Sequence, residues 1–265
     1  MPWTLAGPFA GRSHDSQNVL MTIGSVLVDF DGTACPVDVT GELCEHFAAG
    51  DWAACDDAVR RQLMTPRAAI DRQAAMLPDG RSEMLRFVLD SFSVAPSFVT
   101  MVRWAESLGL PVAVVSDGLG FYVEPMLAAV GLDRVRVLTN LLASSPSPSR
   151  LVHPYAHPEC LGCGTCKMLA ILDYRSQLGP VAFVGEGQSD RFAAHYTDVV
   201  FAKQRLAEIC EDEGIGFLPW ATFADVQRAL TETSFEPRDE MPRVCPGWSP
   251  TRISASSHTQ RSRPA

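Results

Sequence analysis

The chain has 265 residues, of which 46% are hydrophobic and 20% charged, with a formal net charge of −9 and a pI near 5.1. This composition is typical of a globular protein with a sizeable core, built as one large domain or as a core with a smaller insertion. The negative charge argues against nucleic acid or an anionic membrane surface as the main partner. Residues 1–17 lack the apolar centre of a signal peptide and no apolar run reaches the length of a membrane span, so we expect a cytoplasmic protein.

Two segments with biased composition flank the predicted core. Residues 1–20 and 234–265 read as flexible tails, the second rich in Pro, Ser and Arg. Between them short β-branched runs alternate with helical patterns such as Pro96–Leu108, which is typical of a parallel sheet with crossover helices. The strands are expected at Ser25–Asp29, Pro111–Ser116, Arg134–Leu138, Pro180–Gly185 and Asp198–Ala202. The predicted fold class is therefore α/β, with a Rossmann-like core over residues 21–35 and 94–233.

A helical insertion is predicted over residues 36–93. The segment contains no good strand, and its Ala, Leu, Arg and Asp residues recur with helical spacing, interrupted at Pro66 and at Pro78-Asp79-Gly80. The insertion directly follows the first strand, so we expect these short helices to form a cap over that end of the sheet. Asp38, where the chain enters the cap, is a candidate for facing a substrate, although the simpler interpretation is a solvated helix residue.

Two carboxylates follow the first predicted strand. Asp29 and Asp31 are separated by one residue, and Gly32 turns the chain, so both lie at the carboxyl end of the strand, where ligands of open α/β sheets collect. Two acids this close need a cation between them, a shared proton or different roles. An ordinary Asp-Gly turn would explain Asp31-Gly32 without any chemistry.

A second strand end and a lysine supply groups that can bind an anion. Ser116-Asp117-Gly118 brings a hydroxyl and a backbone N–H to the same sheet edge, or else forms a simple turn. Lys167 opens a helix expected over Met168–Leu178, and a helix start already attracts anions. Of the 22 basic residues only Lys167 and Lys203 are lysine, so each is a candidate for a place that needs a compact ammonium.

The strand Pro180–Gly185 is followed by two further acids, Glu186 and Asp190. Together with Asp29 and the main-chain carbonyl of Asp31 they would form an all-oxygen site, which suits Mg²⁺. Asp190 is also a candidate cap for the next helix.

The loop before Lys167 is a candidate for a second metal site. This loop offers soft ligands, and Cys-x-x-Cys spacing suits Zn²⁺, although zinc sites usually combine two distant halves. The candidates are Cys160, Cys163 and Cys166, with His153 and His157 nearby. The competing interpretation is a reduced, glycine-rich loop that positions Lys167.

Taken together, the four motifs resemble the haloacid dehalogenase superfamily, whose phosphatases carry them in this order. The matching residues are Asp29, Asp31 and Thr33; Ser116; Lys167; and Glu186 with Asp190. Within the superfamily the chain is most similar to the phosphoserine-phosphatase-like branch, and its segments 163–167 and 198–219 resemble the methionine-salvage subfamily. The resemblance covers about residues 21–230.

The resemblance implies a Mg²⁺-dependent phosphatase acting on a small phosphorylated metabolite. Asp29 would be the nucleophile, Asp31 the acid and base, and Lys167 a catalytic cation. Thr33, Ser116, Asp117, Gly118 and Asp38 would contact the substrate, and Asp29, Asp31, Glu186 and Asp190 would hold the metal. Glu186 departs from the pattern, which has Asp there. A phosphoserine or sugar-phosphate phosphatase, or an impaired phosphate- or partner-binding domain, stays open as an alternative.

Overall fold

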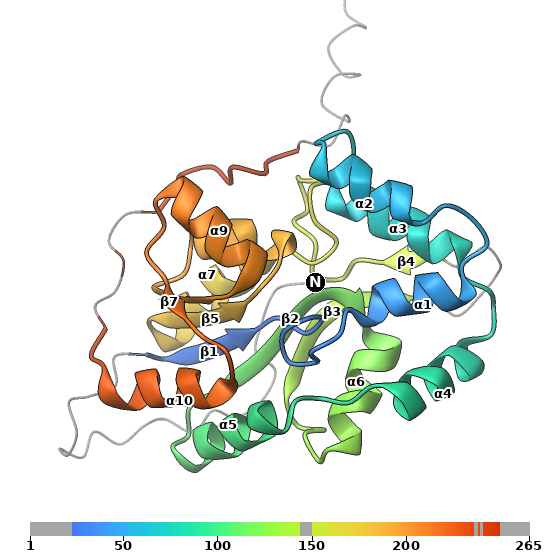
Figure 1. Cartoon of the computed structure of the whole chain (residues 1–265). Helices are drawn as coiled ribbons and strands as arrows, with labels where there is room; N and C mark the ends of the chain where they lie inside the picture. Colours follow the sequence, from blue (N-terminus) through green and yellow to red (C-terminus); the bar gives the residue numbers. More distant parts are fainter. Residues whose placement is uncertain (1–22, 144–149, 236–237, 239–240, 250–265) are drawn as a thin grey trace, which may run out of the picture.

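The computed structural model describes residues 23–143, 150–235, 238 and 241–249. Its centre is a seven-stranded sheet in the order β4-β3-β2-β1-β5-β6-β7, in which every pairing is parallel except that of β3 with β4 (Figure 1). The strands are β1 Ser25–Val28, β2 Val112–Leu119, β3 Arg136–Leu142, β4 Leu151–Val152, β5 Val181–Gly185, β6 Val199–Ala202 and β7 Leu218–Pro219.

Helices cover both faces of this sheet, as its apolar strands require. All four residues of β1 are buried, and alternate ones pack into two separate hydrophobic clusters. One cluster lies under α5 Pro96–Ser107, α6 Gly120–Ala129 and α10 Phe223–Glu232; the other lies under α7 Lys167–Leu178, α8 Arg191–Ala194 and α9 Gln204–Glu213. A short 3₁₀ turn, Gln188–Asp190, precedes α8. Because the core fills both faces, the carboxyl edge of the sheet is left for ligands.

Four helices lie between β1 and α5, and we call them the helical insertion. They are α1 Val39–Phe47, α2 Ala53–Arg60, α3 Pro66–Met76 and α4 Arg81–Ser91, and they stand beside the carboxyl edge of the sheet (Figure 1). Local sequence fixes two of their starts. Asp38 accepts a hydrogen bond from the Gly41 N–H at 3.0 Å, and Thr65 accepts one from Ala68 before the N1 proline.

The insertion is tied to the segment between β4 and α7. His153 bridges the two parts: its Nδ1 lies 2.7 Å from Asn140 Oδ1, and its Nε2 lies 2.9 Å from Asp71 Oδ1 on α3. The Arg67 N–H donates to the Gly162 carbonyl at 3.1 Å. These contacts hold the insertion against the loop that precedes α7.

The predicted α/β class with a Rossmann-like parallel sheet is confirmed, and the five expected strands occur within a few residues of their predicted bounds. The sequence interpretation missed β4 and β7, because each has only two residues. The predicted N-terminal tail lies outside the described residues. In the predicted C-terminal tail, the described part packs on the core, since the Leu161 N–H donates to the Ser249 carbonyl at 2.7 Å.

No single helix in the described ranges is long and apolar enough to cross a membrane. Helices α4 and α5 meet the criterion of length and composition only as a pair, across a 92° bend. Both also contribute buried side chains to the hydrophobic core, among them Met84, Val88, Phe98 and Met101.

Candidate active site

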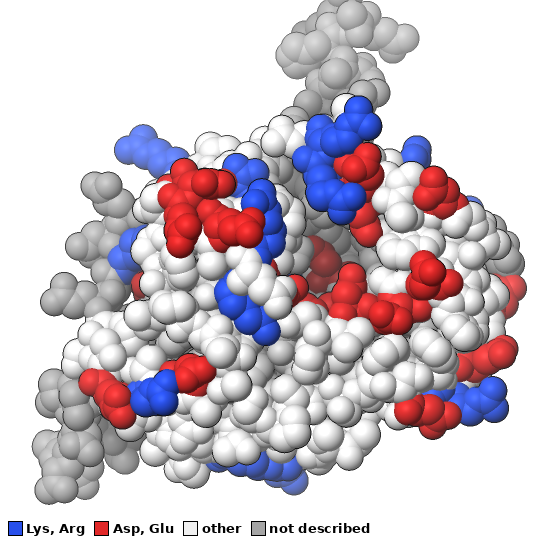
Figure 2. All heavy atoms as spheres, viewed as in Figure 1, with Lys and Arg blue, Asp and Glu red and all other residues white. Residues whose placement is uncertain are grey.

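A cavity of about 380 Å³ opens between the carboxyl edge of the sheet and the helical insertion. Figure 2 shows a hollow between the two lobes of this face with acidic side chains at its floor. The lining residues that come from the core are Asp29, Asp31, Ser116, Asp117, Gly118, Glu186, Gly187, Gln188 and Ser189. Those that come from the insertion and its entry are Asp38, Thr40, Asp56, Val59, Arg60, Pro66, Ala69, Ile70 and Gln73. The predicted motifs therefore meet at one place.

Lys167 and two carboxylates form a buried ionic network at the base of this cavity. The Lys167 ammonium donates to Asp29 Oδ1 at 2.7 Å, to Asp190 Oδ1 at 2.6 Å and to Ser189 Oγ at 3.1 Å. Lys167 is 3% exposed, Asp29 5% and Asp190 0%. All three N–H groups of the Lys167 ammonium therefore have acceptors, and these acceptors fix its position beside Asp29 from three sides.

This network carries more negative than positive charge. Burial opposes the charged form of Lys167, but the carboxylates of Asp190, Asp29 and Asp117 outweigh it and raise its pKa. Burial and the Asp190 anion raise the pKa of Asp29, against the lowering effect of Lys167. One ammonium therefore serves two buried carboxylates, and a further cation beside Asp29 would stabilise its ionised form.

Asp31 lies two residues on, in a different environment. Its Oδ2 accepts a hydrogen bond from the Tyr122 hydroxyl at 2.7 Å, and its Oδ1 accepts one from the Val39 N–H at 3.0 Å. Desolvation and the nearby Asp38 raise the pKa of Asp31 to about 7, although both hydrogen bonds act to lower it. A carboxyl with a pKa near neutrality can both give and take a proton.

Ser116, Asp117 and Gly118 lie beside these two acids at the end of β2. The Ser116 hydroxyl is 3.4 Å from Asp31 Oδ2 and accepts a hydrogen bond from the Gly118 N–H at 2.9 Å. An added Cβ on Gly118 would overlap Asp31 Oδ2 and the Tyr122 hydroxyl, so only glycine fits there. The Asp117 carboxylate accepts from the Thr165 N–H at 2.7 Å, which ties the loop before Lys167 to the sheet.

Glu186 and Asp190 have unlike surroundings. Both oxygens of Asp190 are occupied, Oδ1 by Lys167 and Oδ2 by the N–H groups of Glu186 and Gly187 at 3.0 and 3.1 Å. The Glu186 carboxylate lies against Gly32, where an added Cβ would overlap it. Glu186 therefore faces the turn that carries Asp29 and Asp31, whereas Asp190 anchors Lys167 and the loop after β5.

The donor set at this edge fits a hard divalent cation. Among the described residues, no three His, Cys, Asp or Glu side chains form a group that could hold a metal ion. Mg²⁺ does not require such a cage, because it is usually bound through one or two carboxylates, with water and substrate phosphate as the remaining ligands. Asp29 and Glu186 both line the cavity and are the candidate carboxylates, and the excess negative charge at Asp29 favours a cation there.

The remaining two predicted substrate contacts lie at the edges of the site. Thr33 is 2% exposed, and its hydroxyl has no hydrogen-bond partner among the described residues. It is not among the residues that line the cavity. Asp38 lies at the cavity wall, where its carboxylate caps α1.

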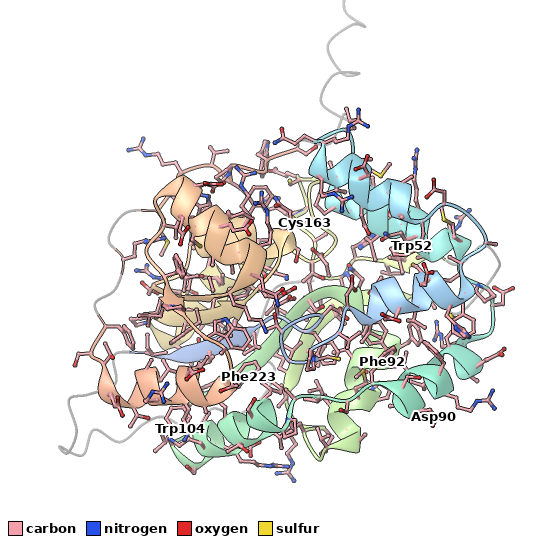
Figure 3. The ribbon with its side chains drawn as sticks, viewed as in Figure 1. Trp52, Asp90, Phe92, Trp104, Cys163 and Phe223 are labelled. Atoms are coloured by element: carbon pink, nitrogen blue, oxygen red, sulfur yellow. The ribbon has the colours of Figure 1, made fainter. Side chains whose placement is uncertain are left out.

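The expectation of zinc at Cys160, Cys163 and Cys166 is not supported. Within the part of the chain that the structure describes, no metal-binding group of cysteines is present. These three are free thiols that line a separate cavity of about 20 Å³ with Cys245. Burial raises the pKa of Cys163, and that of Cys166 to about 12, so both thiols are protonated at neutral pH. Figure 3 labels Cys163 on this loop.

Sequence reasoning missed the neutral donors of the site, above all Tyr122. Tyr122 is fully buried at the start of α6, where the pattern indicates only an apolar helix. Ser189 was also missed, although its place beside Asp190 in a polar loop after a strand was an available signal. Nothing in the sequence marks the Val39 N–H, because its direction depends on the turn at Gly32.

Comparison with known proteins agrees with this geometry. Residues 26–195 match the family described as haloacid dehalogenase-like hydrolase. A 2-hydroxy-3-keto-5-methylthiopentenyl-1-phosphate phosphatase of Exiguobacterium sp. is 30% identical over 204 residues, which are 76% of this chain and 94% of that protein. A protein of the same name from Bacillus velezensis is 26% identical over 208 residues, 77% of this chain and 88% of that one.

Solved structures share the fold at lower identity. A HAD-family hydrolase from Salmonella enterica aligns with a TM-score of 0.62 at 16% identity, covering 80% of this chain and 73% of that one. A phospho-aspartyl intermediate analogue of phosphoserine phosphatase aligns with a TM-score of 0.59 at 15% identity, covering 80% and 100%. The chain therefore belongs to the haloacid dehalogenase-like hydrolase family, and the curated relatives described above are phosphatases.

Proposed function

We propose that the protein hydrolyses a small phosphomonoester through an aspartyl-phosphate formed on Asp29. The observation that carries this proposal is the Asp29–Lys167–Asp190 network, which holds a carboxylate at the floor of a cavity beside a fixed ammonium. Lys167 occupies Asp29 Oδ1, and this leaves Oδ2 for attack on phosphorus. The positive charge of the ammonium then stabilises the phosphoryl oxygens as charge moves onto them, and the Ser116 hydroxyl, which lines the cavity, binds one of them.

Asp31 is the proton donor and acceptor in this mechanism. As Asp29 bonds to phosphorus and the ester bond breaks, the leaving alkoxide takes the proton of Asp31. Asp31 then takes a proton from the water that attacks the aspartyl-phosphate, which releases inorganic phosphate and restores Asp29. Mg²⁺, held by Asp29 and Glu186, would neutralise charge on the phosphoryl group when bound.

The wall of the cavity formed by the insertion favours a substrate with an apolar tail. Val59, Pro66, Ala69 and Ile70 form its apolar part, and the polar residues of the same wall are Asp38, Thr40, Asp56, Arg60 and Gln73. The one basic residue among the described lining residues is Arg60, which is exposed and lies 3.3 Å from Asp57. Phosphoserine would leave its carboxylate without a buried cation at this wall. We therefore propose 2-hydroxy-3-keto-5-methylthiopentenyl-1-phosphate, the substrate named for the relatives, or a phosphomonoester with a similar apolar tail.

The test is phosphate release from a panel of esters, each with and without Mg²⁺. The panel contains the methylthio ester, phosphoserine, a sugar phosphate and p-nitrophenyl phosphate, and Asp29→Asn is the inactive control. We expect Mg²⁺-dependent release with the highest kcat/KM for the methylthio ester. No release from any ester would favour a binding domain, and a preference for phosphoserine would overturn the assigned tail.

A further inference from the structure

Tyr122 contacts Asp31 without lining the cavity. Its hydroxyl donates to Asp31 Oδ2 at 2.7 Å, and Thr40 Oγ1 lies 2.8 Å from the same hydroxyl. We propose that Tyr122 is a positioning residue, which holds the carboxyl of Asp31 in the orientation needed to pass a proton to the leaving group. This inference rests on the proposed function, because it assigns to Tyr122 a part in the proton transfer by Asp31.

The hydrogen bonds of Asp31 restrict its rotation. Tyr122 donates to Oδ2, while the Val39 N–H donates to Oδ1 at 3.0 Å. Two donors on different oxygens fix the plane of a carboxyl group, whereas one donor leaves it free to turn. The only other side chain that donates to Asp31 among the described residues is Ser116, at 3.4 Å, too long for a strong bond. Tyr122 is therefore the main side-chain restraint on Asp31.

The proton order of the chain from Thr40 to Asp31 follows from the donors available. A phenol has one proton, and that of Tyr122 points to the carboxylate of Asp31. While Asp31 is ionised, Thr40 then donates its own proton to the Tyr122 oxygen at 2.8 Å. Thr40 lies on α1 and lines the cavity, so this contact joins the helical insertion to the acid through one buried hydroxyl.

The residues packed around Tyr122 hold its side chain, and with it the hydroxyl, in one position. The side chain is fully buried, and its ring lies 6.1 Å from that of Phe30 and 5.5 Å from that of Phe121, measured between centroids. The hydroxyl fills the space over Gly118 that any side chain there would need. A phenylalanine would fill the same space as the Tyr122 ring. Burying a hydroxyl costs free energy unless the hydroxyl is hydrogen-bonded, so we assign the Tyr122 hydroxyl its role through the contact with Asp31.

The test compares ester substrates that differ in their need for an acid. A poor leaving group such as an alkoxide requires a proton, while p-nitrophenolate leaves without one. We expect Tyr122→Phe to lower kcat/KM for alkyl phosphates by about tenfold, which is part of the roughly 10²–10⁴-fold rate increase that proton transfer supplies. The same variant should leave kcat/KM for p-nitrophenyl phosphate nearly unchanged. Thr40→Val should show the same selectivity with a smaller effect.

Tyr196→Phe is the matched control. It removes a hydroxyl from a tyrosine that is 3% exposed and whose oxygen has no hydrogen-bond partner among the described residues. Both esters should be hydrolysed as by the wild type. Should Tyr122→Phe fail to fold, as judged by circular dichroism, Thr40→Val carries the comparison.

The outcomes separate this inference from the proposed function. An equal loss for both esters in Tyr122→Phe, or no loss for either, overturns the positioning role. A wild type that hydrolyses neither ester, or an Asp29→Asn variant that still turns over, overturns the phosphatase itself. Selective loss with alkyl esters in an otherwise active enzyme supports the inference.

Discussion

The two halves of the site hold their carboxylates by opposite means. Asp29 is bound to an ammonium that it shares with Asp190, inside a network of full charges. Asp31, two residues away, is bound by a phenol and a backbone amide, both neutral donors. The same strand end thus presents one carboxylate bound by a charged donor and one bound by neutral donors.

This difference matches the two tasks in the proposed mechanism. A nucleophile must be an anion; burial and Asp190 raise the pKa of Asp29, and the positive charge of Lys167, together with a further cation beside Asp29, acts against this to favour the ionised form. A general acid must hold a proton, and neutral donors do not prevent this, since the pKa of Asp31 is raised to about 7. The environment of each acid, rather than its residue type, assigns its role.

Replacing Asp29, the proposed nucleophile, should have the largest effect. Asp29→Asn keeps the shape of the side chain but removes the anion that attacks phosphorus, so turnover should fall below detection. The measurement is phosphate release, with mass spectrometry of acid-quenched enzyme to detect a phosphorylated residue. Turnover near the wild-type rate, or a phosphorylated residue in the variant, would show that Asp29 is not the nucleophile.

Replacing Asp31, the proposed general acid, should have a large effect that depends on pH. Since the pKa of Asp31 is about 7, its protonated form predominates below that pH and falls tenfold per unit above it. For an alkyl phosphate at saturating Mg²⁺, kcat/KM of the wild type should therefore decline above about pH 7. Asp31→Asn should be slower by roughly 10²–10⁴ and lose this decline. A decline that persists in Asp31→Asn would assign it to another group.

Lys167→Arg should lower kcat/KM roughly 10²-fold although it retains the positive charge. Three acceptors surround the compact ammonium at 2.6–3.1 Å, and a planar guanidinium cannot reproduce those directions. The matched control is Lys203→Arg at the other lysine of the chain, whose Nζ lies 4.0 Å from the Trp220 ring centroid, because arginine also packs on aromatic rings. Equal activity of Lys167→Arg and wild type would remove the need for an ammonium at this position.

The sequence could predict the charged half of the site but not the neutral half. Asp29, Lys167 and Asp190 are charged residues at predicted strand and helix ends, and parallel strands bring such ends to one edge of the sheet. Tyr122 and Thr40 lie 82 residues apart in an apolar helix and in the insertion, so their contact depends on how the insertion is placed. Periodicity carries no information about that placement.

The same limit explains the loop before Lys167. Its cysteine spacing suggested a zinc site, yet the structure uses this loop to carry Lys167 and to contact the insertion through Gly162. Spacing along the chain defines which ligands are available. It does not define their directions, and these decide whether a metal can bind.

The smallest expected effects concern Glu186 and Asp190, the two acids after β5. Asp190 has both oxygens in hydrogen bonds, whereas Glu186 has its carboxylate against the turn at Gly32. If Glu186 holds Mg²⁺ with Asp29, then Glu186→Gln should raise the Mg²⁺ concentration needed for half-maximal activity, while Glu186→Asp stays active. Asp190→Asn should instead lower the maximal rate, because it removes a charge that anchors Lys167.

The readout is a Mg²⁺ titration of hydrolysis for these three variants, with circular dichroism as the check on folding. A shift in Mg²⁺ requirement confined to Glu186→Gln places the metal on the Glu186 side of the turn. A shift confined to Asp190→Asn would mean that Asp190 releases Lys167 or the loop amides when the metal binds. No shift in any of the three would exclude this acidic pair from the metal site and leave Asp29 as the remaining carboxylate that we propose for it. The longer reach of glutamate, in a family pattern that has aspartate, would then be a substitution without consequence for the metal.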